Sequence, residues 1–120
     1  MKRLFWAVIL CATPVFAQQA ELVTTASGAT LRALDKISGD LTDLELNQGD
    51  VRAFGRLTVA LTECRYPSDD PSSNAYAHLR IIDSSTGTMS FDGWMVAASP
   101  ALNALDHPRY DVWVLRCNIS

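Results

Sequence analysis

The sequence predicts a small all-β domain, an antiparallel sandwich or barrel of about six strands with one short helix before the last strand. Short runs in which apolar and polar residues alternate recur along the chain, and turn residues separate them. Strands at this spacing are typical of sandwiches and small barrels. The chain shows no internal repeat, heptad or low-complexity tract. These patterns favour one compact β domain.

Residues 1–17 predict a cleaved secretory signal peptide. Two basic residues at positions 2 and 3 precede an apolar run over residues 4–12, and small residues lead to Ala17 before a polar stretch. The apolar run is too short to span a bilayer. We therefore expect an exported protein, in a compartment where disulfides persist.

The exported part of the chain is the size of one domain. Residues 18–28 are small and polar and are expected to form a flexible lead-in, and residues 29–120 are expected to form a single β domain. The ten Lys and Arg residues include Lys2 and Arg3, so the exported chain carries eight basic and 13 acidic side chains, a net charge of −5. Without a basic cluster it lacks the electrostatic footprint for nucleic acid or anionic lipid. No later segment is long enough for a transmembrane helix.

Six β-rich runs follow the lead-in, and they cover residues 29–37, 42–47, 53–65, 75–83, 88–97 and 110–117. In the second and fourth runs alternate residues are apolar, which is typical of a strand with one buried face. A long exposed loop is expected over residues 66–74. The last run is apolar on both faces, which predicts a central rather than an edge strand.

The third run contains an irregularity. Its apolar residues from Leu57 to Leu61 share one face, but the same alternation would then place Glu63 inside and Cys64 outside. A β-bulge near Thr62–Glu63 turns Cys64 inward.

Two thiols, Cys64 and Cys117, remain after the signal peptide is removed. Cys11 follows Leu10, where a lipoprotein signal needs a small residue, so we expect Cys11 to be discarded rather than lipidated. In an oxidising compartment two cysteines allow one disulfide. A redox pair and two independent buried thiols are the alternatives. The spacing is not C-x-x-C, and we therefore favour a structural Cys64–Cys117 bond.

Residues 99–105 interrupt the β pattern. Ser99 suits a helix N-cap, Pro100 suits the first helical position, and the alanines and leucines that follow are strong helix formers. We expect one to two helical turns here, ended by Asp106-His107-Pro108.

His107 is the candidate catalytic residue, with Asp106 or Asp111 to orient its imidazole as a general base requires. However, no serine or cysteine nucleophile lies in a recognisable elbow. A hydrogen-bonded histidine at a helix end is the structural alternative. His78 is expected to be a solvated surface residue beside Arg80. We therefore predict no catalytic, metal or cofactor site.

The aromatic residues supply the candidate binding surface. Trp94 lies on the opposite face of its run from the apolar residues that flank it. Tryptophan in a small β domain is usually in the core. If Trp94 is instead exposed beside Tyr66 or Tyr110, it forms a partner-binding or sugar-stacking platform. We take Trp94, Tyr66, Tyr110 and His107 as the candidate ligand- or partner-binding residues.

Several stretches together resemble the DUF2155 family: Leu31-Arg32-Ala33-Leu34-Asp35-Lys36, Phe54-Gly55-Arg56-Leu57, Cys64-Arg65-Tyr66-Pro67, Gly93-Trp94-Met95, and Ser99–Cys117. The last stretch, with its Asp-His-Pro-Arg-Tyr-Asp-Val-Trp-Val-Leu-Arg-Cys ending, is the most specific. The resemblance covers nearly all of the exported chain. It implies a small exported alphaproteobacterial protein with no established activity, located in the periplasm, and it carries over no catalytic residues.

We therefore expect a periplasmic, non-enzymatic binding or accessory module that acts on a protein or envelope polymer. The alternative is a small hydrolase-type enzyme that uses His107 with Asp106 or Asp111. Geometry distinguishes the two, because a binding module leaves the aromatic candidates exposed, whereas an enzyme places His107 in a cleft with an orienting carboxylate.

Overall fold

The computed structural model describes residues 22–119, and this part of the chain contains eight β-strands and no helix. The strands are β1 Val23–Thr25, β2 Gly28–Asp35, β3 Leu41–Asn47, β4 Val51–Phe54, β5 Leu57–Pro67, β6 Tyr76–Asp83, β7 Thr88–Val96 and β8 Tyr110–Asn118. Within the described residues no helix is long and apolar enough to cross a membrane. The signal peptide predicted for residues 1–17 lies outside them.

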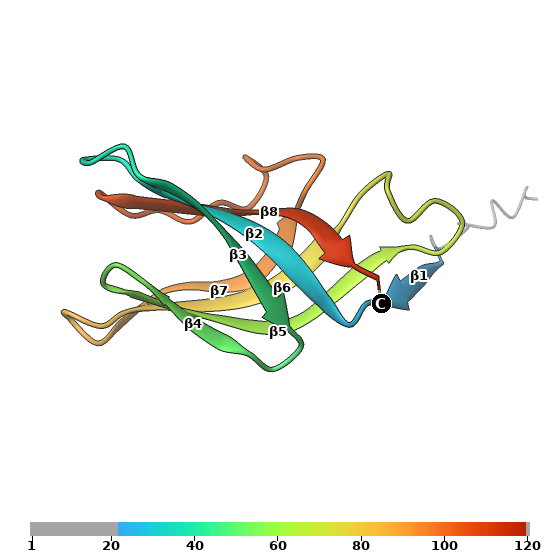
Figure 1. Ribbon diagram of the computed structural model, residues 1–120, viewed down its shortest axis with the longest axis horizontal. Coiled ribbons are helices and arrows are strands. Elements are labelled where there is room, and N and C mark those ends of the chain that lie inside the picture. Colours follow the sequence, from blue (N-terminus) through green and yellow to red (C-terminus); the bar gives the residue numbers. More distant parts are fainter. Residues whose placement is uncertain (1–21, 120) are drawn as a thin grey trace, which may run out of the picture.

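The strands form two antiparallel sheets that face each other (Figure 1). The larger sheet has the order β1-β5-β6-β7, and β4 also pairs with β5; the smaller sheet has the order β3-β2-β8. The predicted all-β class is confirmed, and of the two architectures considered the sandwich is correct, because the two sheets do not close into a barrel.

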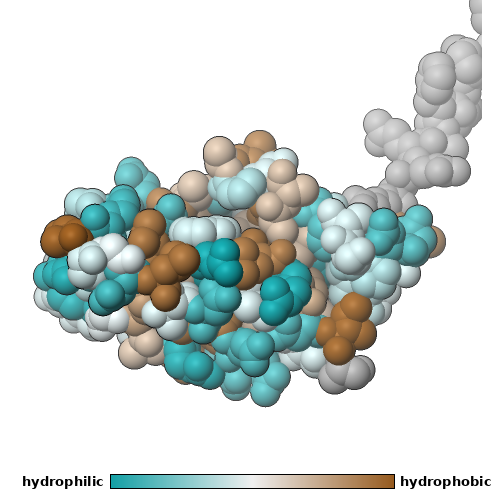
Figure 2. Space-filling model, turned by 45° about the horizontal axis from the view of Figure 1, so that its top comes forward, coloured by the Kyte–Doolittle hydropathy of each residue, from teal (hydrophilic) through white to brown (hydrophobic). Residues whose placement is uncertain are grey.

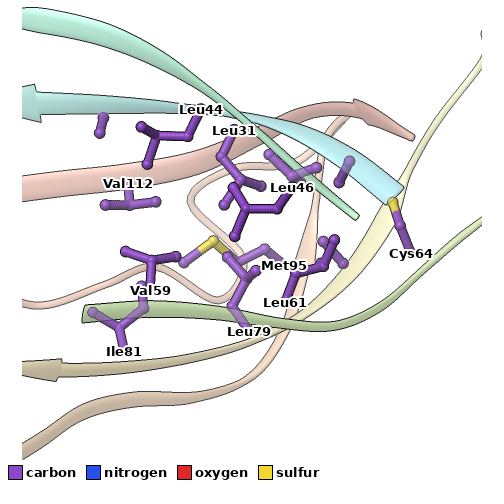
Figure 3. Close-up of a cluster of buried hydrophobic side chains, with 14 of the residues drawn as sticks. Leu31, Leu44, Leu46, Val59, Leu61, Cys64, Leu79, Ile81, Met95 and Val112 are labelled. Carbon is purple, nitrogen blue, oxygen red and sulfur yellow. The ribbon is translucent and has the colours of Figure 1, made fainter. Parts of the chain in front are cut away.

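The core lies between the two sheets and is built by the alternation read from the sequence. Apolar side chains from both inner faces meet there, as Figure 3 shows. The residues at positions 57, 59 and 61 of β5 and at 77, 79 and 81 of β6 are at most 1% exposed, and their neighbours on the other face are more exposed. In β8, Val112 and Val114 point inward while Trp113 and Leu115 are half-buried on the other side.

The predicted short helix at residues 99–105 is wrong. This connection between β7 and β8 forms turns instead, with a hydrogen bond from the Leu102 N–H to the Ser99 carbonyl three residues earlier. Seven residues cannot offset the cost of helix nucleation unless an apolar stripe packs against the fold. Here only Leu105 is buried, while Leu102 is 76% exposed. The segment is held by its ends rather than by a helical face.

The strand count differs from six for two reasons. The run predicted at residues 53–65 is a hairpin, because Gly55 and Arg56 form a two-residue turn between β4 and β5. Gly55 has a φ of +55°, which glycine adopts without strain and which suits a tight hairpin. In addition, β1 lies within the segment 18–28 that was expected to be a flexible lead-in, and it pairs with Arg65–Pro67 of β5.

The prediction that the last run is a central strand is also wrong. β8 pairs only with β2, so it is an edge strand of the smaller sheet. Its outward apolar residue Trp113 is partly covered by the β7–β8 connection rather than by another strand, since both line one groove. The apolar residues on both faces of β8 therefore reflect contacts made above and below the sheet. They do not show that β8 has a paired strand on each side.

The predicted bulge and disulfide are both confirmed. The register of β5 against β6 shifts between Leu61 and Glu63, which leaves Thr62 unpaired and turns Cys64 inward. Cys64 is bonded to Cys117 of β8, with 5.7 Å between the two Cα atoms. The bond joins the larger sheet to the smaller one across 53 residues of sequence. For a loop of this length the chain-entropy model gives a stabilisation of about 4 kcal/mol.

We expect the Cys64→Ala/Cys117→Ala double variant to lower the free energy of unfolding by about 4 kcal/mol, because the unfolded chain then loses its cross-link. Denaturant titration of both proteins measures this difference. The matched control is the wild type after reduction, which should unfold at the same denaturant concentration as the double variant. Two titratable thiols per chain in the denatured, unreduced protein would contradict the bond itself.

Candidate functional site

His107 lies in a buried hydrogen-bond network at the end of the sandwich opposite the disulfide. Its Nε2 is 2.9 Å from Oδ2 of Asp83, the last residue of β6. Its Nδ1 accepts the backbone N–H groups of Arg109 at 3.0 Å and Tyr110 at 3.1 Å. Because Nδ1 accepts both bonds, Nε2 carries the hydrogen and donates a hydrogen bond to the Asp83 carboxylate. Both ring nitrogens are therefore occupied, and the side chain is only 7% exposed.

The carboxylates proposed as partners of His107 do not contact it. Asp106 is exposed, and Asp111 lies half-buried in β8. The partner is Asp83, which the sequence analysis missed. The inward alternation of β6 extends from Ile81 to Asp83 and therefore places an acid in the core, where it needs a partner. That pattern could have identified it.

A second acid, Asp35, ends β2 in the same way and pairs with Arg109. The guanidinium donates from Nη2 to Oδ2 at 2.9 Å and from Nε to the same oxygen at 3.2 Å. Lys36 adds a 2.6 Å bond from its ammonium group to the His107 carbonyl. We call Asp35, Asp83, His107, Arg109 and Tyr110 the end cluster, because they tie the last strand to both sheets.

These contacts lower the pKa values of both acids well below their usual range. For Asp83 the main cause is the bond from His107, followed by two bonds from Ser85. For Asp35 the main cause is the bond from Arg109, and burial opposes it. Each carboxylate is thus strongly stabilised in its ionised form in the folded protein.

Tyr110 completes the end cluster from inside the core. It is 2% exposed, and its hydroxyl oxygen accepts the Arg56 backbone N–H at 3.3 Å. A Cβ atom added to Gly55 would lie 2.5 Å from that hydroxyl, so the turn needs glycine for space as well as for its φ. Tyr66 is half-buried against the core. Neither tyrosine lies beside Trp94 on the outer face.

Trp94 lies on the outer face of the larger sheet, where no other sheet covers it. It is directly opposite His78 of β6, and their rings stack with 5.1 Å between centroids and 24° between planes. The Arg65 guanidinium from β5 lies 5.0 Å from the Trp94 ring centroid. Its Nη2 is also 2.6 Å from the Glu63 carboxylate. Side chains from β5 and β6 thus hold the indole of Trp94 in position.

An open groove of about 320 Å³ lies beside this ring and is lined by Val23, Arg65, Tyr76 and Trp94. We call it the Trp94 groove. Of these four residues, the sequence analysis proposed only Trp94 as a candidate binding residue. The other three come from β1, β5 and β6, and they meet because β1 pairs with Arg65 and Arg65 pairs with Tyr76. Their meeting depends on strand register, which no local pattern shows.

A second groove, of about 380 Å³, lies between the β7–β8 connection and β8, and it is lined by Pro100, Ala101, Ala104, Asp111, Val112 and Trp113. Its walls are mostly small and apolar, with one acid. Figure 2 shows one face of the molecule, on which hydrophobic side chains stand between hydrophilic ones. Unlike the Trp94 groove, this groove is lined by no cationic side chain against its aromatic ring. It also lacks the combination of cationic and anionic side chains found beside Trp94.

A family model described as "Uncharacterized protein conserved in bacteria (DUF2155)" matches residues 29–117. The chain belongs to the DUF2155 family. An uncharacterized protein of Rickettsia prowazekii (strain Madrid E) is 28% identical to this DUF2155 protein over 88 residues. The matched region is 71% of this chain and 57% of the relative, so the chain spans just over half of that relative's length. No solved structure matches.

The match to the DUF2155 family contains most of both candidate regions. The end cluster and the disulfide lie wholly within residues 29–117, and so do three of the four residues that line the Trp94 groove. Val23, the fourth, precedes the matched range. The geometry of this DUF2155 protein thus separates a buried, fully bonded histidine from a half-buried tryptophan on the outer face of the larger sheet.

We expect His107→Ala to lower the free energy of unfolding by about 3 kcal/mol. The side chain makes three hydrogen bonds, and their loss leaves the buried Tyr110 N–H and the Asp83 Oδ2 atom without these partners. Val114→Ala should cost roughly 2 kcal/mol through lost burial and a cavity. His78→Ala, which removes the exposed-face histidine, is the matched control and should cost about 0.5 kcal/mol or less. Chemical denaturation ranks the three variants, and a smaller loss for His107→Ala than for His78→Ala would contradict a structural role.

We expect the stability of the protein to fall as the pH drops below about 4. The folded chain keeps Asp35 and Asp83 ionised, whereas in the unfolded chain they bind protons near pH 3.9, so protons favour unfolding. The effect is absent above about pH 5, where both states are ionised. Denaturation measured from pH 6 to pH 2 should show a weaker acid dependence for Asp83→Asn than for the wild type. Asp69→Asn, in an exposed loop, should leave the pH dependence unchanged.

Proposed function

We propose that this DUF2155 protein is a periplasmic, non-enzymatic binding or accessory module that acts on a protein or envelope polymer through the Trp94 groove. The observation that carries the proposal is the half-exposed Trp94 ring, held by His78 and Arg65 beside an open groove. A tryptophan offers the largest contact area of any side chain together with a polar N–H group, and such residues dominate binding surfaces.

The ring is also preorganised. His78 stacks on it from the neighbouring strand, and Glu63 holds Arg65, whose guanidinium lies near the ring. The Asn103 side chain also donates a 2.9 Å hydrogen bond to the backbone carbonyl of Trp94. A side chain already fixed in its binding position loses little conformational entropy when a ligand arrives. This rigidity supports a binding role for Trp94.

The alternative, a hydrolase that uses His107 with Asp106 or Asp111, gains no support from the geometry. A general base needs a nitrogen within hydrogen-bond reach of the substrate. Both nitrogens of His107 are bonded inside the protein, and neither of those acids contacts it. The periplasmic location rests on the predicted signal peptide and on the Cys64–Cys117 disulfide, which suits an oxidising compartment.

We expect Trp94→Ala to lower retention of the exported protein on an isolated envelope fraction by about tenfold, because it removes the contact surface of the groove. Co-sedimentation with the fraction measures the retention. Trp113→Phe is the matched control, since it changes a half-buried tryptophan on the other sheet, and it should leave the retention unchanged. Equal retention of the wild type and Trp94→Ala, with both proteins folded, would refute binding through this groove. Protease treatment of the fraction then separates a protein partner, whose binding is lost, from a polymer, whose binding persists.

A further inference from the structure

We infer that the Trp94 groove takes a neutral glycan chain, whose sugar rings pack against the part of the indole that lines the groove. This inference rests on the function proposed above and names the ligand class of the same site. It follows from three properties of the outer face of the larger sheet. Its charges balance, and it presents both hydrogen-bond donors and acceptors. The backbone groups beneath the groove are already paired between strands, so they cannot bind a ligand.

The charges around the ring compensate each other. Arg65 is paired with Glu63 at 2.6 Å, and Asp92 lies 3.8 Å from the Arg80 guanidinium and 3.3 Å from the His78 ring nitrogen. With His78 neutral, these five side chains carry no net charge. An acidic polymer would need uncompensated cations, and a basic one would need uncompensated acids. The surface therefore favours an uncharged ligand.

Both kinds of polar group surround the indole. Arg65 supplies donors, Glu63 and Asp92 supply acceptors, and the neutral His78 ring has one nitrogen of each kind. A sugar hydroxyl donates one hydrogen bond and accepts others, so it can use both kinds of group. A sugar ring with equatorial hydroxyls also has a flat apolar face with polar groups around its edge, which matches an aromatic ring bordered by charged side chains.

The position of the groove on the sheet disfavours an extended peptide. Peptides that bind β domains as added strands use the free backbone groups of an edge strand. The groove lies on the face of the larger sheet, where Arg65 of β5 and Tyr76 of β6 stand between Val23 of β1 and Trp94 of β7, and β5 and β6 each pair with strands on both sides. Binding there must use side chains alone. Because the groove is open, a long chain can pass across it without presenting an end.

Titration of the exported protein with neutral tetrasaccharides tests the inference. The probes are chitotetraose and cellotetraose, with tetragalacturonate as the anionic comparison and a synthetic proline-rich peptide as the protein-like one. The readout is the NMR signal of each indole N–H, assigned with the Trp94→Phe and Trp113→Phe variants. A neutral tetrasaccharide should shift the Trp94 signal and leave the Trp113 signal in place, and added salt should change the affinity little.

The variants add a charge readout that a merely structural role would not produce. Trp94→Ala should weaken binding of the neutral tetrasaccharide by about tenfold, and Trp94→Phe by less, because phenylalanine keeps part of the platform. Glu63→Gln removes the acid that compensates Arg65, so it should give tetragalacturonate an affinity that the wild type lacks. A Glu63→Gln protein that still ignores the anionic probe would contradict the charge argument.

Three outcomes would overturn the inference, and they differ in what they do to the proposed function. If only the peptide shifts Trp94, and envelope binding depends on Trp94 and is destroyed by protease, the groove binds protein and only the glycan assignment fails. If tetragalacturonate binds the wild type more tightly than the neutral probes, the ligand is anionic. If no probe shifts Trp94 and envelope binding is the same in Trp94→Ala, both the inference and the proposed function fail.

Discussion

The single extra residue in β5 decides which face of the sheet each following side chain of that strand occupies. Both the disulfide and the contact of Arg65 with Trp94 depend on it. Thr62 has no partner in β6, so the alternation restarts with Glu63 outward and Cys64 inward. Without this bulge Cys64 would point to solvent and could not reach Cys117, and Arg65 would point into the core instead of toward Trp94. This irregularity gives the outer face its cation, and together with the register shift of β8 at Leu115, which turns Cys117 inward, it gives the sandwich its cross-link.

The two ends of the sandwich are closed by different chemistry. At one end a covalent bond joins β5 to β8. At the other end the closure is polar, because His107 reaches the larger sheet at Asp83 while Arg109 reaches the smaller sheet at Asp35. Buried polar groups stabilise a fold only when all of them are hydrogen-bonded. Among the described residues, no buried side-chain nitrogen or oxygen lacks a hydrogen-bond partner. His107, the candidate catalytic residue of the sequence analysis, therefore stabilises the fold.

Features that depend on alternation were predictable, and features that depend on register were not. The inward faces of β5 and β6 and the bulge follow from a period of two, and the disulfide follows from cysteine count and compartment. The tight turn at Gly55 was hidden inside a continuous β-rich run, and the helix signal at Ser99–Pro100 was outweighed because that segment has no apolar face to bury. Trp94 could be named from the sequence, but its partners Arg65 and His78 are brought to it only by pairing across three strands.

The pairing of β2 with β8 has a consequence for how the chain reaches this structure. Gly28 lies opposite Asn118, so the smaller sheet joins segments from opposite ends of the described chain. Such non-local contacts form slowly, and a chain that emerges from its N-terminus first makes the β2–β3 hairpin long before β8 exists. An isolated hairpin is marginally stable in water, and the inner face of this one carries Leu31, Leu44 and Leu46. β8 is the last strand of the described chain, so the core stays open to solvent where Val112 and Val114 belong until that strand has been made.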